Sequence, residues 1–156
     1  MGKATSQDNT VCRNRKATFR FEFLDQFECG IVLEGPEVKS LRDKAVSLEE
    51  AYARIVNDEV WLIGMHIAAY KHTSREVGEP TRRRKLLLHS HEVRKLRPKV
   101  EQKGLTLVPV RLYFNDRGIA KVTLALARGK TVGDKRQALK ARDDQREMNR
   151  ALRRKR

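Results

Sequence analysis

The composition of the last 29 residues limits most strongly how this chain can fold. Residues 128–156 contain 12 Lys or Arg and 4 Asp or Glu, a net charge of +8. Their apolar residues Leu139, Met148 and Leu152 form no continuous stripe at helical spacing, so the segment has no face to bury. It is rich in helix formers, but an isolated helix with repelling charges is marginal in water. We therefore expect residues 134–156 to be a basic C-terminal tail, disordered when free and helical on an anionic surface; the alternative is a solvated tail without an ordered target.

The residues before the tail have a pattern typical of short β-strands. Thr18–Leu24 alternates aromatic and polar residues, as a half-buried strand does, and another strand begins at Gly30. Apolar runs flank polar turns within 55–69 and 105–127, and each predicts a hairpin. The sequence therefore predicts a mainly β protein, a small antiparallel barrel with short flanking helices.

Two short helices are expected beside the strands. Ser47 begins a Ser-x-x-Glu pattern, the spacing of a capping box, which predicts a helix over residues 47–54. Residues 90–103 have apolar positions at helical spacing, with Pro98 as a kink or break and Gly104 as a stop.

Two segments lack apolar periodicity. We expect residues 1–13 to be a flexible N-terminal arm and residues 71–81 to be a loop. The chain is therefore expected to consist of the arm, a body over residues 14–133 and the tail.

The net charge of +15 on 156 residues favours a polyanionic partner, which in the cytosol is mainly RNA or DNA. No stretch is apolar enough for a membrane span or a signal peptide, so we expect a cytoplasmic protein without a membrane partner. Cys12 and Cys29 lack the spacing of a disulfide framework or a zinc site, and His89 and His91 have no third ligand at metal spacing. No metal and no cofactor is therefore expected.

Two other functional classes can be weighed against nucleic-acid binding. A nuclease needs clustered carboxylates or paired acid and base groups, and neither Glu34 with Glu37 nor Asp143 with Asp144 stands beside a completing residue. Enzymatic activity is therefore not expected. A structural ribosomal protein would also have a basic tail and a β-barrel, so composition leaves that alternative open.

Five sequence runs, spread from residue 14 to residue 136, resemble those of a known family. They are Asn14-Arg15-Lys16-Ala17, Phe27-Glu28-Cys29-Gly30-Ile31, Glu37-Val38-Lys39-Ser40-Leu41-Arg42, Arg84-Lys85-Leu86-Leu87-Leu88-His89, and Gly129-Lys130 with Asp134-Lys135-Arg136. In this order they resemble the SmpB family, the SsrA-binding proteins of bacteria. The resemblance implies an OB-type barrel that binds the tRNA-like domain of transfer-messenger RNA and delivers it to stalled ribosomes for trans-translation, without catalysis. It also implies a monomer whose tail enters the vacant mRNA path at the decoding centre of the small subunit.

The resemblance places RNA contacts at five positions: Asn14, Glu28, Leu86, Lys121 and Gly129. Asn14 would offer its amide, and Glu28 would accept a hydrogen bond from a base amine or a ribose hydroxyl. The alternative for Glu28 is a strand-edge acid paired with a neighbouring Arg or Lys. Leu86 would contact an unstacked base or belong to the core.

Further basic residues would extend this surface through phosphate contacts. They are Arg15, Lys16, Lys39, Arg42, Arg83, Arg84, Lys85 and Lys130. The run 82–85 directly precedes three leucines whose burial would fix the direction of its charges; the alternative is a solvated run. In the tail, the resemblance implies ribosome contacts at Asp134, Lys135, Arg136, Lys140, Arg142, Arg146 and Arg150.

The chain departs from the family pattern at two places. Gly133 stands where the family commonly has an aromatic residue or His, so a stacking contact on ribosomal RNA is absent there or supplied elsewhere. Thr18-Phe19-Arg20-Phe21 replaces a segment that usually carries His, an acidic residue and Tyr. The strand pattern is kept, without the usual polar groups.

Overall fold

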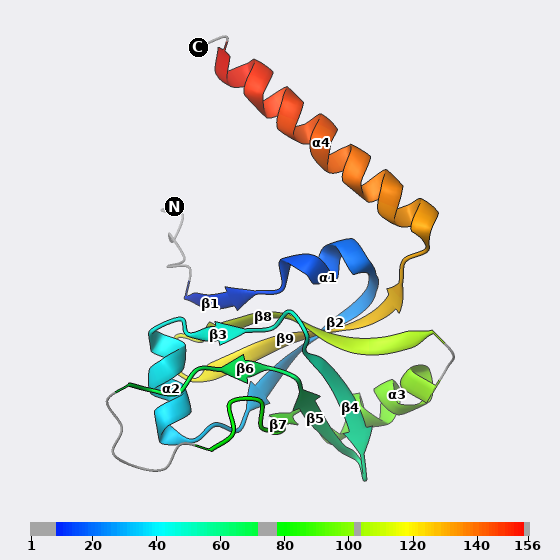
Figure 1. Ribbon diagram of the computed structural model, residues 1–156. Coiled ribbons are helices and arrows are strands. Elements are labelled where there is room, and N and C mark those ends of the chain that lie inside the picture. Colours follow the sequence, from blue (N-terminus) through cyan, green and yellow to red (C-terminus); the bar gives the residue numbers. More distant parts are fainter. Residues whose placement is uncertain (1–8, 72–77, 102–103, 155–156) are drawn as a thin grey trace, which may run out of the picture.

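Strands joined mainly into one sheet form the body of the protein, and helices lie around it (Figure 1). This computed structural model describes residues 9–71, 78–101 and 104–154. The mainly β prediction is confirmed, and no helix in the described residues is long and apolar enough to cross a membrane. The elements are β1 (Thr10–Arg13), α1 (Arg15–Arg20), β2 (Phe21–Ile31), α2 (Gly35–Arg42), β3 (Val46–Ser47), β4 (Tyr52–Val56), β5 (Glu59–Ile63), β6 (His66–Ile67), β7 (Arg84–Leu87), α3 (Ser90–Glu101), β8 (Leu105–Phe114), β9 (Ala120–Gly129) and α4 (Val132–Arg154).

The main sheet has seven strands in the order β1-β8-β4-β5-β7-β2-β9, paired antiparallel. β9, at one end of this order, also pairs with β8, near the other end. β3 and β6 form a separate pair. The main sheet is therefore curved round on itself, with an inner and an outer face.

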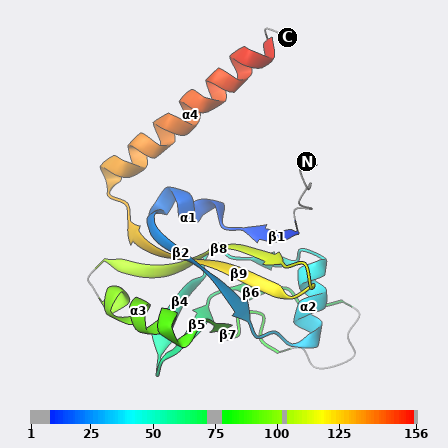
Figure 2. The ribbon, with the colours of Figure 1, turned by 180° about the vertical axis from the view of Figure 1, so that it is seen from behind.

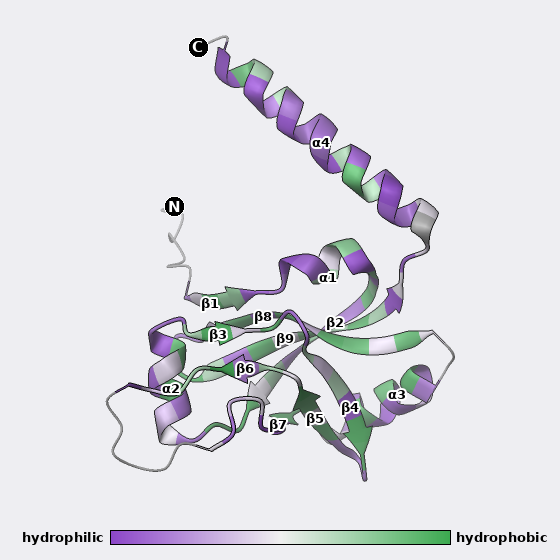
Figure 3. Cartoon of the chain, viewed as in Figure 1, coloured by the Kyte–Doolittle hydropathy of each residue, from purple (hydrophilic) through white to green (hydrophobic). Residues whose placement is uncertain are grey.

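The core lies on the inner face. Leu62 of β5, Leu107 of β8 and Leu124 of β9 are fully buried there. Leu41 of α2 and Leu96 of α3 enter the same cluster. Figures 1 and 2 show these two helices at opposite ends of the sheet, and Figure 3 shows hydrophobic residues concentrated in the strands.

Both predicted hairpins are present. The β4–β5 turn has Asn57 and Asp58 with φ of 51° and 60°, the two positive values of a type I′ turn, whose twist matches that of the strands. The β8–β9 turn is held by Asn115, whose side chain accepts hydrogen bonds from the N–H groups of Arg117 and Ile119 at 3.1 and 2.9 Å.

β5 ends at Ile63, earlier than the predicted hairpin strand, because the chain turns at Gly64. Gly64 has a φ of +81°, and a Cβ there would lie 2.5 Å from the carbonyl oxygen of Glu50. Only glycine fits such a close approach. His66–Ile67 then pairs with β3 instead of continuing the hairpin.

The N-terminal part differs from the expected pattern. Residues 1–8 of the expected arm lie outside the described residues, but residues 10–13 pair with β8 as β1. The expected strand at Thr18 is wrong up to Arg20, because Asn14 caps a helix, α1, in this place. The two strands expected at 18–24 and from Gly30 are a single strand, β2.

The helix predicted over residues 47–54 is wrong. Ser47 belongs to β3, and β4 follows, because pairing with β5 and burial of Ala53 outweigh the local helix signal. A capping box is present instead at the start of α2, where the Glu34 N–H donates to Glu37 at 2.9 Å.

α3 begins at Ser90 as predicted and extends to Glu101; the rest of its predicted range lies outside the described residues. Pro98 is inside this helix and does not end it. The predicted loop over residues 71–81 lies mostly outside the described residues.

The tail is one helix, α4, which extends away from the body (Figures 1 and 2). Its start is fixed by Asp134, which accepts a hydrogen bond from the Thr131 hydroxyl at 2.8 Å and donates its N–H to the same oxygen at 3.3 Å. Every described side chain from Leu139 to Arg154 is exposed. A reciprocal cap and strong helix formers support this helix; the expectation that the segment is disordered when free stays a prediction.

Candidate nucleic-acid interface

A groove on the outer side of the sheet brings together two of the predicted contact residues. It has a volume of about 550 Å³. Glu28 of β2 and Lys121 of β9 approach to 4.0 Å between Oε1 and Nζ, and the Glu28 side chain remains 61% exposed. The carboxylate is thus both paired with a neighbouring cation and open to a ligand. The groove is lined by Glu28, Gly30, Ile31, Leu87, Leu88, His89, Glu92, Ile119 and Lys121.

The strand register explains why these two side chains meet. Glu28 pairs with Thr123, and Gly30 pairs with Lys121. Alternate residues of a strand face the same side, so Glu28 and Lys121 leave the sheet on one face, whereas Cys29 between them in the register is fully buried. Burial raises the pKa of the Cys29 thiol to about 12, with smaller effects of nearby charges, so this thiol is inert.

Two further residues on this face were not among the predicted contacts. Tyr113 pairs with Lys121, and Arg111 pairs with Thr123. The Arg111 guanidinium lies 4.4 Å from the centroid of the Tyr113 ring. Burial, followed by the influence of the nearby Glu28 carboxylate, raises the pKa of Tyr113 to about 12.

Leu87 and Leu88 supply apolar lining to the groove, in place of the predicted Leu86. Leu86 is 2% exposed and belongs to the core, so the prediction that it contacts a base is wrong. The alternation along β7 turns Leu87 outward, and Leu87 and Ile119 are about half exposed. These exposed apolar groups can pack against a base.

Asn14 is a structural residue in this structure, not an exposed contact. It is 5% exposed, and its side chain accepts a hydrogen bond from the Ala17 N–H at 3.2 Å. Its amide also donates to the carbonyls of Leu48 and Pro109 at 3.1 and 3.0 Å. With its donors and acceptor engaged in this way, the amide is not free to bind RNA.

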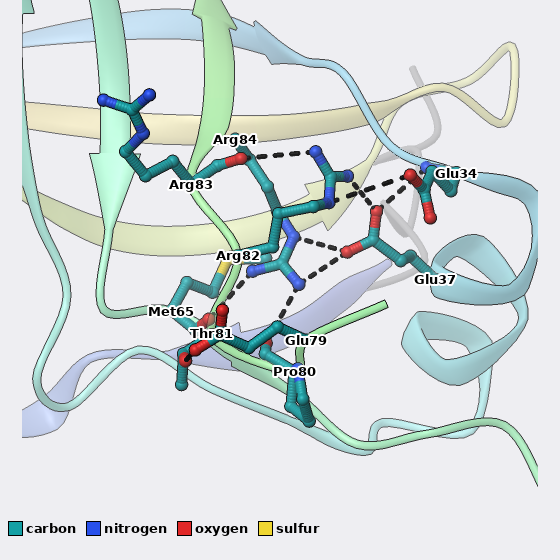
Figure 4. A network of polar contacts seen from close by, with 9 residues as sticks. All are labelled: Glu34, Glu37, Met65, Glu79, Pro80, Thr81, Arg82, Arg83 and Arg84. Carbon is teal, nitrogen blue, oxygen red and sulfur yellow. Dashed lines mark hydrogen bonds and ion pairs between the residues drawn. The ribbon is translucent and has the colours of Figure 1, made fainter. Parts of the chain in front are cut away.

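The side chains of the basic run 82–85 point in different directions. Figure 4 shows Arg82 and Arg84 directed toward Glu37 and Arg83 directed away from it. Arg84 is fully buried and bonds to Glu37 at 2.5 Å, so the prediction that it contacts phosphate is wrong. Arg82 pairs with the other oxygen of Glu37. Arg84 also donates to the carbonyls of Met65 and Pro80 at 2.8 and 3.0 Å.

The pKa values of both Glu37 and Arg84 are lowered in the folded protein. Burial alone would raise the pKa of Glu37, but hydrogen bonds from Glu34, Arg82 and Arg84 hold it below its usual value. Burial lowers the pKa of Arg84, and Glu37 opposes that shift. The pair therefore stays ionised and joins α2 to β7.

Arg83 and Lys85 face outward, as predicted for a contact surface. The Arg83 guanidinium lies 5.3 Å from the centroid of the Trp61 ring, and Lys85 pairs with Glu59 at 2.9 Å. Both therefore lie over β5, the neighbour of β7.

Two more groups of predicted basic residues lie elsewhere. On α2, Lys39 and Arg42 stack on aromatic rings, with the Lys39 ammonium 5.5 Å from the Tyr70 centroid and the Arg42 guanidinium 5.9 Å from that of Phe114. Around α1, Arg15 is exposed and Lys16 pairs with Glu49 at 3.0 Å. Gly129 ends β9, and Lys130 donates its amine to the Thr18 carbonyl at 2.9 Å.

The tail residues predicted to contact the ribosome all lie on one helix, α4. Asp134 is engaged in the cap, whereas Arg136, Lys140, Arg142, Arg146 and Arg150 are exposed and Lys135 is half-buried. Arg146 lies 3.9 Å from Asp143, one turn away. The charged side chains of the helix therefore face solvent along most of its length, and Figure 3 shows that most of its residues are hydrophilic.

The described part of the chain holds no group of three or more His, Cys, Asp or Glu residues placed to bind a metal ion. His89 and His91 stack on each other, with ring centroids 5.5 Å apart. His89 adds a polar ring to the rim of the groove.

The sequence contained enough information to place Tyr113 and Arg111 on the same face of the sheet as Lys121. Both lie in the predicted hairpin, opposite Lys121 and Thr123 once the turn is placed at Asn115. Pairing the hairpin residue by residue would have put them on the face of Lys121. By contrast, the pairing of β2 with β9 brings Glu28 to them from a distant part of the chain.

Comparisons with known proteins identify relatives along nearly the whole chain. The family model of the SmpB protein matches residues 11–154. The SsrA-binding protein of Chelativorans sp. (strain BNC1) is 52% identical over 143 residues, 92% of each chain. That of Thermosynechococcus vestitus is 53% identical over 143 residues, 91% of this chain and 93% of the other. A solved structure described as "tmRNA-SmpB: a journey to the center of the bacterial ribosome" is similar with a TM-score of 0.67 and 49% identity, over 82% of this chain and 93% of that one.

Proposed function

The chain belongs to the SmpB protein family, and we therefore propose that it binds the tRNA-like domain of transfer-messenger RNA and delivers this RNA to stalled ribosomes. The observation that carries the proposal is the family match over residues 11–154, which includes both the body and the tail. In this function the protein acts in the cytoplasm, in trans-translation and ribosome rescue, by binding and without catalysis.

The groove around Glu28 supports RNA binding by the body. A carboxylate repels phosphate, so its place on such a surface favours a contact with a base amine or a ribose hydroxyl. Lys121 and Arg111 offset that repulsion. Arg83, Lys85, Lys39 and Arg42 lie on other parts of the body and would contact phosphates.

We also propose that the body is an OB-type barrel. The support is the ring of pairings, in which β8 pairs with both β4 and β9. Such barrels bind oligonucleotides on their outer strands and loops.

The tail is the part proposed to enter the mRNA path of the small subunit. α4 contacts α1 at its root and is exposed beyond it. Arg136, Lys140, Arg142, Arg146 and Arg150 would then meet ribosomal RNA, where the charge of a vacant path is negative.

The first test is to recover the tagged protein from its own cells at moderate salt and to sequence the bound RNA. Strong enrichment of one RNA with a tRNA-like end and a short reading frame is expected. Lys121→Glu should reduce this enrichment, whereas Lys95→Glu, at an exposed position of α3, is the matched control. Bulk ribosomal RNA without such enrichment would instead favour a resident ribosomal protein.

A further inference from the structure

We propose that the Trp61 ring and the Arg83 guanidinium form a stacking site for one unpaired base of the RNA, on the outer face of β4, β5 and β7. The inference rests on the proposed function, because it adds a second contact with the RNA that binds at the groove around Glu28. The groove offers a carboxylate acceptor, whereas this site offers a flat ring surrounded by cations.

The strand register brings the side chains of this site together. Trp61 of β5 pairs with Arg54 of β4 on one side and with Lys85 of β7 on the other. Val60 and Leu62, the neighbours of Trp61 along β5, are buried, so the alternation of the strand turns Trp61 to the outer face. Trp61 is half-buried there, and Arg54 is exposed.

Arg83 lies over this tryptophan. Its guanidinium carbon is 5.3 Å from the centroid of the Trp61 ring, within the range of a cation–π contact. Figure 4 shows the Arg83 side chain directed away from Glu37, and Arg83 is exposed. Aromatic rings and guanidinium planes are the groups on which proteins stack unpaired RNA bases. A guanidinium stacks through its face and binds phosphate through its edge, so Arg83 can do both.

The charge of this face matches an RNA strand. Arg54, Arg83 and Lys85 supply three cations, and Glu59 supplies one carboxylate, which pairs with Lys85 at 2.9 Å. Positive charge around an aromatic ring suits a stacked base and the phosphates on either side of it. An acidic peptide would match the charge alone, whereas a nucleotide matches both the charge and the ring.

The site continues the surface of the groove. Leu87 lines the groove and follows Lys85 on β7 by two residues, about 7 Å along the strand and on the same side. Leu87 also pairs with Gly30 of β2, two residues after Glu28. An RNA strand bound at the groove can therefore reach Trp61 by crossing β7.

Affinities of the full-length protein for the tRNA-like domain of transfer-messenger RNA, measured at several salt concentrations, test the site. Trp61→Leu should weaken binding about tenfold, the size expected for one stacked base, with an unchanged salt dependence. Trp61→Phe keeps a ring and should retain most of the affinity. Arg54→Gln should instead lower the slope of log affinity against log salt by about one, as loss of one phosphate contact does.

Phe23→Leu is the matched control for loss of a ring. The half-buried Phe23 packs against the separate cluster of Val108, Ala125 and Ala127. This variant should bind as wild type. Urea unfolding of Phe23→Leu and Trp61→Leu checks that both are folded under the conditions of the binding measurement.

A second measurement uses the unaltered protein. Trp61 is the single tryptophan of the chain, so intrinsic fluorescence reports this site directly. A single-stranded oligoadenylate should quench the fluorescence by stacking. A blunt RNA duplex of the same length carries the phosphates but keeps its bases stacked on one another, and it should quench little.

The fluorescence can also contradict the proposal. Equal quenching by the single strand and the duplex would show attraction by charge without stacking. Quenching by a peptide of consecutive Glu residues, and not by oligoadenylate, would assign this face to an acidic protein.

The outcomes separate this inference from the proposed function. If wild type does not bind the tRNA-like RNA, both are wrong. If Lys121→Glu weakens binding and Trp61→Leu does not, the stacking site alone is wrong. Equal losses in Trp61→Leu and Trp61→Phe would also overturn it, because a retained ring would then bring no benefit.

Discussion

Asn14 joins three parts of the body through one buried amide. It caps α1, and its two other bonds reach Leu48 before β4 and Pro109 in β8. A residue predicted as an RNA contact thus stabilises the place where the chain enters the sheet.

Asn14→Ala should therefore lower the free energy of unfolding, by about 2–4 kcal/mol, because a helix cap is lost and two buried carbonyls lose their donor. Urea unfolding measures this change. Asn149→Ala, at an exposed position of α4, is the matched control and should unfold as wild type. Unchanged stability together with weaker RNA binding would restore the original prediction for Asn14.

The Glu37–Arg84 pair predicts a pH dependence of stability. Glu37→Gln leaves a buried guanidinium without its carboxylate and should cost about 3–5 kcal/mol at neutral pH. Since the pKa of Glu37 is lowered by folding, its contribution is complete above the unfolded value of about 4.3. That contribution is lost as the pH falls through the folded pKa.

Urea unfolding of wild type and Glu37→Gln from about pH 7 to about pH 3 checks this. The difference between the two proteins should shrink below about pH 4. Glu101→Gln is the control, because its pair with Arg97 is exposed on α3 and contributes little. A difference that is the same at every pH would argue against an ionised Glu37.

The sequence predicted which residue types take part in the candidate site better than it predicted which of their side chains are buried. Glu28 and Lys121 lie in one groove as exposed, charged neighbours. Arg84 and Leu86 carry the same signals as their neighbours, but strand alternation turns them inward. The phase of that alternation is set by pairing with β5 and β2, which a single sequence does not reveal.

Among the helices and strands, hairpin turns and the apolar spacing of α3 were predicted better than the helix expected from a capping pattern. The two hairpins and α3 follow from local turns and spacing. The Ser47 capping pattern failed because partners distant in sequence select a strand for residues 52–56. The start of α4 is marked by Thr131 and Asp134, which cap each other in a Thr-x-x-Asp pattern visible in the sequence.

Asp134→Ala should weaken the start of α4. Loss of the cap should destabilise the first turn by about 1 kcal/mol, equivalent to about fivefold faster amide hydrogen exchange there. Asp144→Ala removes the same carboxylate from an exposed position in the middle of the helix and is the control. Equal exchange in both variants would show that the cap does not hold the helix.

For the whole molecule, the separation of body and tail predicts separable losses. Deleting the chain from Asp134 onward should leave affinity for the tRNA-like RNA nearly unchanged, because the groove lies entirely in the body. The same deletion should abolish tagging of stalled products. Binding and tagging assays on one protein preparation measure both.

A variant with a Gly/Ser linker of equal length in place of the tail is the control for chain length. It should behave as the deletion does. Loss of RNA binding as complete as that of a groove variant would contradict the division of labour.

Because α4 is long and exposed, a small rotation at its start displaces its C-terminal end by a large distance. At 1.5 Å per residue, its 23 residues measure about 35 Å from root to tip. A change of about 10° at the root therefore moves the tip by about 6 Å, more than one helical turn. Lys130, directly before α4, helps to set that angle by donating its amine to the Thr18 carbonyl of α1. A substitution beside α1 can thus misdirect the end of the chain without touching any residue that meets a partner.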